Sequence, residues 1–454
     1  MIALTLAALV ALEPPPSWPV TLTVTEGKTL VLKACFPGNA AAGVRVATPR
    51  ARRALLSATA EPGAIPLKPG PEGAWSLPHG AADCFTATYD AVALARPPMS
   101  LAGSFDPRDV LLSPIGAGLG ERSARVSFAT SAAAQLWVPW QRAAPNAFRA
   151  PDSAFRLPGN AFVRPHFSSR TLAMHGTTAH VSLADGFATL DLDGVLAWLS
   201  RALAVNAELF GDFPCSEWSL VVVPAPPGAA GRGSPVVFGS ASRGGGPHVV
   251  AFVPGDVRAE SLPGEWVLVH ELFHLAQPWI GEGWFAEGLA TYYGEVLRAR
   301  AGVLSPAELW AALLDGFRRG ASVGGELPLG REEDEMVARR TFWRVYWGGA
   351  ALALLADVRF RSRGAGSLDD GVRALSARPE LKDARAALAV IAEVTGDDGF
   401  TALATAALAS KAFPEITRTL EALGVREGPG GVTLDDAAPL AAVRRAIETG
   451  ARPE

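Results

Sequence analysis

The sequence predicts a multidomain α+β protein, in which a β-sandwich-like domain over residues 18–184 precedes a mostly helical domain with a small sheet over residues 185–426. Short apolar alternations bounded by glycine, proline and threonine fill the first stretch, as is typical of antiparallel strands. From Asp191 onward, apolar residues recur mostly at helical spacing. The length of 454 residues accommodates two or three domains, and residues 427–454 are expected to form a tail with one short helix.

The composition is that of a folded protein without a strongly charged partner. Hydrophobic residues make up 49% of the chain and the net charge is −4, which excludes intrinsic disorder. No basic cluster is present, so we expect neither a nucleic-acid partner nor a polybasic membrane contact. Three cysteines without a Cys-x-x-Cys pair exclude a disulfide scaffold, a thioredoxin-type site and a zinc finger. A metal site would therefore have to use the seven histidines and the carboxylates.

The N-terminal segment predicts export to the periplasm or the cell exterior. Residues 2–12 form an apolar run that fits the core of a signal peptide over residues 1–17 and is too short to span a bilayer. A wrongly assigned start codon or a buried first strand of a cytoplasmic protein is the alternative, because no basic residue precedes the run. No later run reaches about 18 apolar residues, so no membrane span is expected. In an exported protein Cys35 and Cys84 can form a disulfide, which leaves Cys215 over, and buried thiols are the alternative.

The expected elements follow the chain in order. Strand candidates of the first domain alternate apolar and polar residues over residues 20–24, 29–32, 124–128 and 179–183. The second domain begins with a helix that ends at Gly211, followed by two short apolar strands; these elements cover residues 195–210, 218–224 and 248–253. Helical periodicity then predicts helices over residues 263–277, 284–298, 306–316, 341–360, 368–375, 383–394, 400–412 and 415–423.

The string HELFH, from His270 to His274, carries the chemistry. Residues four apart lie on one face of a helix, so both imidazoles can bind one metal ion. Glu271 projects beside that face, where it can hold and deprotonate a water without being a metal ligand itself. Ser261 and Pro263 are expected to begin this helix. A pair of surface histidines on an ordinary helix is the alternative interpretation, and the other five histidines lack ligand spacing.

A second string, WFAEGLATYY, follows after a short connection. Together the two strings resemble the gluzincin zinc metallopeptidases, whose third zinc ligand is the glutamate of a W-x-x-E-G-x-x-x-Y-Y helix. The resemblance implies a thermolysin-like catalytic domain, one Zn²⁺ ion held by His270, His274 and Glu287, and hydrolysis of a peptide or protein substrate. Glu282 is the alternative third ligand, although it precedes the helix and lacks the matching flank. Gly288 is expected to let this helix approach its neighbour closely.

A third string, YWGGAAL, begins at Tyr346 and is followed by DVR and SLDD strings. These resemble the glycyl aminopeptidase family of gluzincins, with its Y-x-K-G string, apolar helix, D-x-x-x-R and S-L-D-D. The resemblance implies aminopeptidase-like activity, in which Tyr346 donates a hydrogen bond to the oxyanion of the tetrahedral intermediate. A core tyrosine on an apolar helix is the alternative. The PDZ domain that often follows in this family is expected to be absent.

Two positions depart from the family pattern. Gly348 replaces the lysine of the Y-x-K-G string. Residues 244–248, with the sequence GGGPH, are the expected counterpart of a G-G-L-E-H-like strand but lack the glutamate that can hold the substrate's amine. A catalytically idle zinc- or peptide-binding protein and an endopeptidase without an amine anchor are therefore the alternative functions. Glu295 and Asp357 are the candidates to orient the imidazoles, because Thr291 is not an acid.

Overall fold

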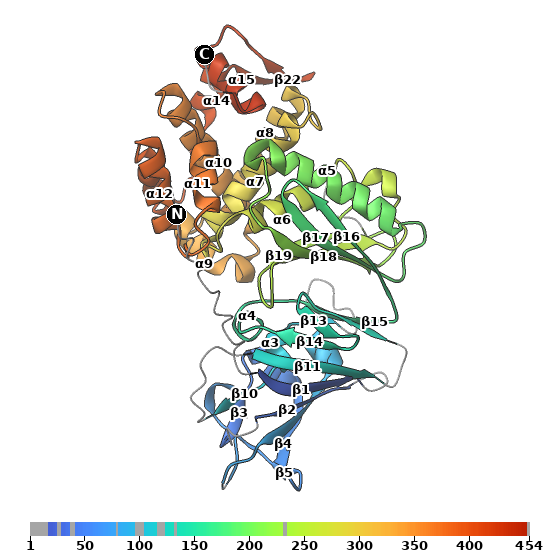
Figure 1. The fold of residues 1–454 in the computed structure, drawn as a ribbon. Coiled ribbons are helices and arrows are strands. Elements are labelled where there is room, and N and C mark those ends of the chain that lie inside the picture. The colour runs from blue at the N-terminus through green and yellow to red at the C-terminus, as the bar shows by residue number, and fades with distance from the viewer. Residues whose placement is uncertain are drawn as a thin grey trace, which may run out of the picture. The chain divides into compact units, whose positions relative to one another are not determined.

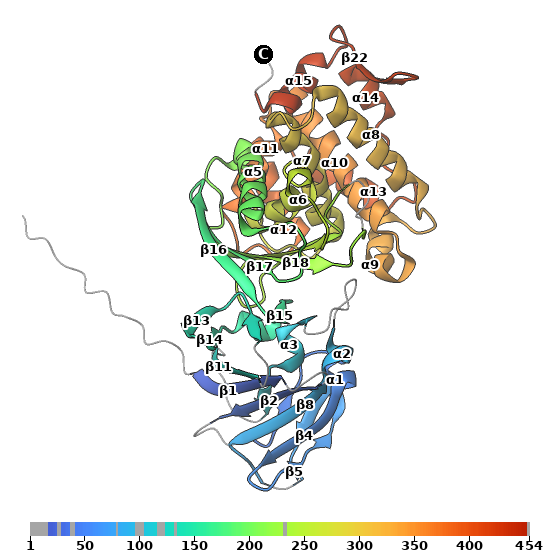
Figure 2. The same cartoon turned by 90° about the vertical axis from the view of Figure 1, so that its right-hand side faces the viewer.

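The computed structural model describes residues 17–24, 29–36, 41–78, 80–95, 104–115, 123–130, 134–229 and 234–451. The apolar run of the expected signal peptide lies outside the described residues. The chain forms two compact units (Figure 1, Figure 2): the first ends at Phe167 and includes Ser242–Pro247, and the second contains Ser168–Ala241 and the chain from His248 onward. A β-rich N-terminal unit followed by a largely helical one confirms the expected α+β fold class.

A large sheet forms the centre of the first unit. Its strands are β1 (Ser17–Val24), β2 (Thr29–Cys35), β4 (Leu55–Glu61), β5 (Ile65–Pro66), β8 (Cys84–Asp90), β11 (Ser123–Thr130), β13 (Gln141–Ala144) and β14 (Ala147–Ala150). They lie in the order β13-β14-β11-β1-β2-β8-β4-β5, with β1 and β11 parallel and β2 antiparallel to both of its neighbours. Buried and half-buried side chains alternate along β2 and β8, so one face of the sheet supplies the core.

Smaller elements complete the first unit. They are β3 (Gly43–Arg45), β6 (Lys68–Pro69), β7 (Ala74–Ser76), β9 (Ser104–Phe105), β10 (Ser113–Ile115), β12 (Gln135–Trp137), β15 (Ala161–Arg164), α1 (Pro49–Ala54), α2 (Ala91–Leu94), α3 (Pro107–Val110), α4 (Ser153–Arg156) and η1 (Pro71–Gly73). Cys35 in β2 lies opposite Cys84 in β8, and a disulfide joins them. The structure therefore decides for the disulfide over two buried thiols. Cys215, in the second unit, donates its thiol proton to the carbonyl of Glu217.

The second unit begins with a sheet of its own. Its strands are β16 (Phe167–Met174), β17 (Thr177–Ala184), β18 (Glu217–Ala225), β19 (Phe238–Ser242) and β20 (His248–Pro254). They lie in the order β16-β17-β18-β20-β19, which makes β19 an edge strand. The structure thus divides the chain earlier than the expected boundary after residue 184. Alternation identifies a strand but not its partner, and here Val181 and Leu183 pack into the core of the helical unit with Trp198.

Helices make up most of the second unit. They are α5 (Leu192–Phe210), α6 (Val267–Ala276), α7 (Gly283–Arg300), α8 (Pro306–Ser322), α9 (Leu329–Arg339), α10 (Phe342–Ser362), α11 (Leu368–Ser376), α12 (Ala384–Thr395), α13 (Gly399–Leu408), α14 (Thr417–Leu423), α15 (Ala441–Thr449) and η2 (Ala259–Ser261). The carboxylate of Asp191 accepts the N–H of Gly194 at the start of α5, and Gly211 ends that helix at φ 68°, as predicted. The sequence did not predict α9, because its string LGREEDEMVAR has few apolar residues to reveal helical spacing.

Two glycines bring α7 and α10 into backbone contact. α7 packs against both α6 and α10 (Figure 2). A Cβ on Gly288 would lie 2.6 Å from the backbone of Gly349, and a Cβ on Gly349 would lie 1.8 Å from the carbonyl oxygen of Trp284. No larger residue fits at either position without moving a helix, which confirms the expected role of Gly288.

The chain beyond residue 426 is an integral part of the helical unit rather than the expected tail. The glycine-rich break at residues 427–431 forms a hairpin of β21 (Val425–Gly428) and β22 (Gly431–Leu434). Ile447 of α15 is fully buried in the core of the unit.

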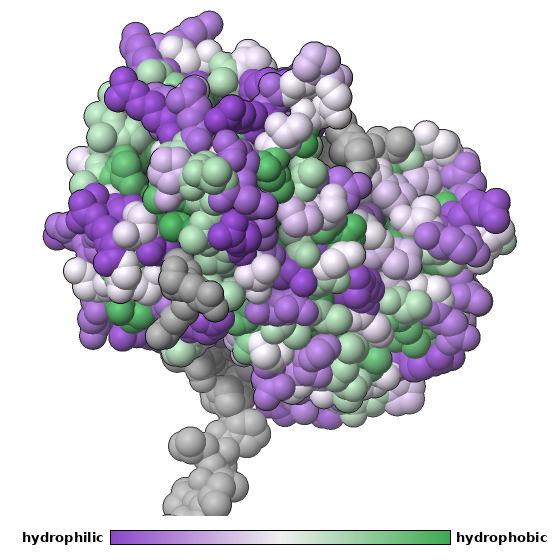
Figure 3. Space-filling model, turned by 90° about the horizontal axis from the view of Figure 1, so that it is seen from above, coloured by the Kyte–Doolittle hydropathy of each residue, from purple (hydrophilic) through white to green (hydrophobic). Residues whose placement is uncertain are grey.

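Among the described residues, no helix has the length and apolar character needed to cross a bilayer. On the face shown in Figure 3, hydrophilic and hydrophobic residues are interspersed.

Candidate metal centre

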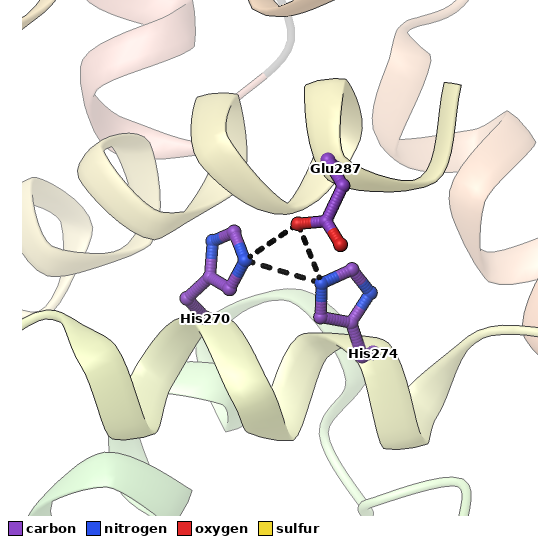
Figure 4. Close-up of side chains that lie close together, drawn as sticks. All are labelled: His270, His274 and Glu287. Atoms are coloured by element: carbon purple, nitrogen blue, oxygen red, sulfur yellow. Dashed lines mark hydrogen bonds and ion pairs between the residues drawn. The ribbon is translucent and has the colours of Figure 1, made fainter. Parts of the chain in front are cut away.

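Two histidines of α6 and one glutamate of α7 point toward one another (Figure 4). Nε2 of His270 lies 3.1 Å from Oε2 of Glu287 and 3.1 Å from Nε2 of His274. The distance from Nε2 of His274 to Oε2 of Glu287 is 3.2 Å. Neighbouring ligands of a tetrahedral zinc ion are about 3.3 Å apart when the bonds to the metal are about 2.0–2.1 Å long. The three atoms therefore fit the protein ligands of one zinc ion.

The geometry separates the two candidate third ligands. Within the described ranges, His270, His274 and Glu287 are the one group of three metal-ligating side chains close enough to hold an ion. Glu282 is the residue immediately before α7 and does not belong to this group. Of the other histidines, His79 lies outside the described residues, and the group does not include the remaining four, His166, His175, His180 and His248.

Burial and positive charge act in opposite directions on the pKa of Glu287. Burial by itself raises the pKa of Glu287, but the charges of His274 and His270 and their hydrogen bonds to the carboxylate lower that pKa well below its usual range. The Glu287 carboxylate is thus held in its ionised form, which is the form that binds a metal. The Trp266 ring and the His270 imidazole form a T-shaped pair, with centroids 5.8 Å apart and an angle of 87° between the ring planes.

Glu271 lies beside the three converging atoms and is held by the edge strand β19. Its Oε2 accepts the backbone N–H of Ala241 at 2.7 Å. A Cβ on Gly239 would lie 2.6 Å from Val267 and 2.8 Å from Cγ of Glu271, so glycine is needed for β19 to approach α6 this closely. Burial is the main cause that raises the pKa of Glu271 to about 7, while the neighbouring His270 lowers it.

The strand beside Glu271 is not the segment that the sequence suggested. Residues 244–247 lie in the loop after β19, and His248 begins β20. Gly244 instead packs within the first unit, where a Cβ would lie 2.3 Å from the carbonyl oxygen of Leu157. β19 itself has the sequence FGSAS and carries no acid either. Neither the edge strand nor the loop therefore contains a counterpart of the family's amine-binding glutamate.

Tyr346 of α10 also reaches the centre. Its hydroxyl lies close enough to Glu287 and Glu271 for both carboxylates to act on its pKa. Burial, followed by the charges of Glu287 and Glu271, raises the pKa of this hydroxyl above its ordinary value, so it remains a proton donor. Two residues further along α10, a Cβ on Gly348 would lie 3.3 Å from the side chain of Leu329, the first residue of α9.

The start of α6 depends on a residue that sequence reasoning missed. The expected cap, Ser261, lies in η2 and its hydroxyl donates to the carbonyl of Arg258. The helix begins at Val267, where the Glu265 carboxylate accepts the N–H groups of Val267 and Leu268 at 2.6 and 2.8 Å. Further hydrogen bonds reach Glu265 from the Trp198 indole and the Ser234 hydroxyl. An acid just before a helix was the available signal, because the positive end of the helix dipole favours it.

The two acids expected to orient the imidazoles have other partners. Glu295 forms an ion pair with Arg298 at 2.7 Å. Asp357 accepts hydrogen bonds from Arg361 and from the hydroxyl of Tyr292. Among the described residues no hydrogen bond joins either carboxylate to His270 or His274, although Glu295 lies near enough to His270 for the charge of that imidazole to oppose the rise in the Glu295 pKa that burial causes. Each carboxylate instead has a charge-assisted hydrogen bond from an arginine.

Known proteins resemble this chain in fold but not detectably in sequence. No family model and no curated protein matches the sequence. The aminopeptidase N family protein from Idiomarina loihiensis matches in structure, with 16% identity and a TM-score of 0.69 over 90% of this chain and 78% of its own. A mutant of a two-domain M1 zinc metallopeptidase bound to L-arginine is 14% identical, with a TM-score of 0.50 over 88% of this chain and 96% of its own. The chain shares its fold with these two solved proteins.

A third match shows the same M1 fold with a peptide present. It is a mutant of the M1 zinc metallopeptidase from Deinococcus radiodurans bound to a Tyr-Ser-Ala substrate, with 16% identity and a TM-score of 0.50. The match covers 88% of this chain and 96% of that one. At this level of identity the likeness is one of fold. The chemistry of this protein therefore depends on its own side chains.

Proposed function

We propose that this protein is a zinc-dependent peptidase, with aminopeptidase-like activity of the kind that its resemblance to the glycyl aminopeptidase family implies. The convergence of His270, His274 and Glu287 beside the buried Glu271 is the observation that carries the proposal. The M1 fold, found in solved zinc metallopeptidases with bound amino acids and peptide, supports it. Peptides or proteins are the proposed substrates, and one Zn²⁺ ion is the proposed cofactor.

Three protein ligands are typical of a catalytic zinc site, in which the fourth position stays open. When held by His270, His274 and Glu287, a zinc ion polarises a carbonyl group and lowers the pKa of a water toward about 7. Glu271 follows a ligand on the same helix without contributing a ligand atom. Its carboxylate takes the proton of the attacking water and passes it to the leaving amine. The Ala241 amide keeps one oxygen of that carboxylate in place throughout.

Tyr346 is proposed to donate a hydrogen bond to the oxyanion of the tetrahedral intermediate. We expect Tyr346→Phe to lower kcat by about 10²–10³-fold, the usual effect of removing one oxyanion donor, with little change in KM. Steady-state kinetics on a peptide substrate measures both constants. Zinc content should remain that of the wild type, because Tyr346 is not one of the three proposed ligands. An unchanged kcat with zinc bound would place Tyr346 in a purely structural role.

The edge strand favours one alternative substrate class. Since the β19 sequence FGSAS has no acid to hold a substrate amine, an endopeptidase with internal cleavage sites is the second candidate. Fluorogenic peptides with free and with acetylated N-termini separate the two. Preferential cleavage of free peptides supports the aminopeptidase, and equal cleavage of both forms supports the endopeptidase.

The proposed function is tested by removing and restoring the metal. We expect the apoprotein, prepared with a chelator, to hydrolyse neither kind of peptide, and addition of Zn²⁺ to restore hydrolysis. The same measurement tests the catalytically idle alternative, which Gly348 and the missing acid motivate. A zinc-loaded protein that binds peptides without cleaving any of them would support that alternative and contradict the peptidase.

We also propose that the protein is exported. Support comes from the Cys35–Cys84 disulfide, since such bonds persist in oxidising compartments, and from the apolar run over residues 2–12. Expression of the full chain followed by cell fractionation and N-terminal sequencing tests the proposal. A processed protein in the periplasm or medium is expected, and an unprocessed cytoplasmic protein with both thiols reduced would contradict it.

A further inference from the structure

Tyr293 links the two helices that carry the candidate ligands. Its ring, on α7, stacks on Phe273 of α6, with centroids 5.2 Å apart and 15° between the ring planes. Phe273 directly precedes His274, and Tyr293 lies on the same helix as Glu287. The hydroxyl of Tyr293 donates a 2.8 Å hydrogen bond to Oδ1 of Asp369, in the first turn of α11. Tyr293 therefore connects both ligand helices to a third element.

The acceptor of this hydrogen bond is itself firmly held. Asp369 forms ion pairs with Arg361 at 2.9 Å and with Arg300 at 3.1 Å. Both arginine side chains are 1% exposed and Asp369 is 2% exposed. Arg361 also binds Asp357 at 2.8 Å. Breaking one pair would leave a buried charge uncompensated, so this cluster resists displacement and gives the Tyr293 hydroxyl a fixed partner.

Tyr292 makes a chemically matched contact without the link to α6. Its hydroxyl donates a 2.9 Å hydrogen bond to Asp357 in the same cluster, and it is as fully buried as Tyr293. Its ring meets Tyr293 edge-on, with centroids 5.2 Å apart and an angle of 74°. Loss of either hydroxyl removes one buried hydrogen bond to a carboxylate. The Tyr293 ring is stacked on Phe273, in the helix of His270 and His274, whereas the Tyr292 ring meets the ring of Tyr293.

We propose that Tyr293 is a positioning residue for the metal centre, because it fixes the α6 and α7 ligands relative to one another through Phe273 and Asp369. The inference rests on the proposed function, since it requires that His270, His274 and Glu287 bind zinc. Mutation of residues that support metal ligands from outside the coordination sphere commonly lowers metal affinity by about 10–100-fold. Because Tyr293 acts through Phe273 and its own helix rather than on a ligand, we expect an effect at the lower end, about tenfold.

Zinc release to excess chromogenic chelator tests this inference without relying on activity. Wild type, Tyr293→Phe and Tyr292→Phe are loaded with zinc and compared at a temperature at which circular dichroism shows all three to be folded. We expect release to be about tenfold faster in Tyr293→Phe and within about twofold of wild type in Tyr292→Phe. Phe273→Leu keeps the hydroxyl bond but removes the stacked ring, so it should also accelerate release, and it decides the question if Tyr293→Phe does not fold.

Two results would overturn the inference alone. One is a wild-type release rate in both Tyr293→Phe and Phe273→Leu, and the other is equal acceleration in Tyr292→Phe and Tyr293→Phe, which would indicate general loosening of the buried cluster. A wild-type protein that takes up no zinc during loading would instead overturn the proposed function, together with everything that depends on it.

Discussion

Replacing Glu271 with glutamine should leave zinc bound and lower kcat by about 10²–10⁴-fold, the range that general acid–base catalysis contributes. Glutamine has the same shape, and its carbonyl oxygen can still accept the N–H of Ala241. It cannot accept the proton of the attacking water. Since Glu271 is not one of the converging ligand atoms, zinc per protein should match the wild type. Steady-state kinetics and metal analysis on the same preparation measure both quantities.

An exposed glutamate from the segment before α6 serves as the matched control. Glu260 lies in η2, and its side chain is 79% exposed. Glu260→Gln makes the same chemical change and should retain wild-type kcat and zinc content. If Glu271→Gln loses its zinc, Glu271 contributes to metal binding, which would contradict its assignment as a base that is not a ligand. Full activity in zinc-loaded Glu271→Gln would contradict it equally.

Removing one ligand imidazole should abolish stable metal binding. Replacing His274 with alanine leaves two of the three converging atoms, and we expect zinc affinity to fall by more than about 100-fold, beyond the usual cost of losing an outer partner of a ligand. Hydrolysis should be lost with the metal. Competition with a chelator of known affinity measures the change. His180→Ala is the control, because His180 is about half exposed on β17 and pairs with Glu217 away from the candidate ligands.

The same measurement distinguishes the two candidate third ligands. Glu287→Gln should weaken zinc binding strongly, whereas Glu282→Gln, at the position before α7, should not. The opposite order would mean that the Glu287 carboxylate only accepts hydrogen bonds from the two imidazoles. Equal effects of both changes would indicate that the start of α7 moves as a whole, and would contradict a fixed three-ligand site.

The part of the site that the sequence predicts best is local. His270 and His274 are brought together by helical spacing alone, which needs no knowledge of the rest of the fold. Glu287 could be proposed as a ligand only from the resemblance to the gluzincins, because the sequence pattern of its own helix does not show that it faces α6. Gly288 gave a correct structural signal, since a glycine within a helix usually marks a close approach. The sequence alone does not decide between a Cys35–Cys84 disulfide and two buried thiols, whereas the structure places the two cysteines opposite each other.

The features that sequence reasoning missed are contacts between distant segments. Glu265 begins α6 through its side chain, while Ser261 looked like the better cap because hydroxyl caps are the commoner signal. β19 lies beside Glu271 only through the pairing order of the sheet, and the string FGSAS reveals neither its edge position nor its neighbour. The helix α9 has too few apolar residues for its period to be recognised. Each of these features depends on which surfaces meet, which local pattern does not encode.

The central claim is that a zinc ion held by His270, His274 and Glu287 acts with Glu271 to hydrolyse peptide bonds. Digestion of a peptide library by zinc-loaded wild type and zinc-loaded Glu271→Gln, with cleavage products identified by mass spectrometry, tests it most directly. We expect new peptide ends with the wild type and almost none with Glu271→Gln at equal zinc content. Equal digestion by both proteins, or no digestion by a fully zinc-loaded wild type, would contradict it.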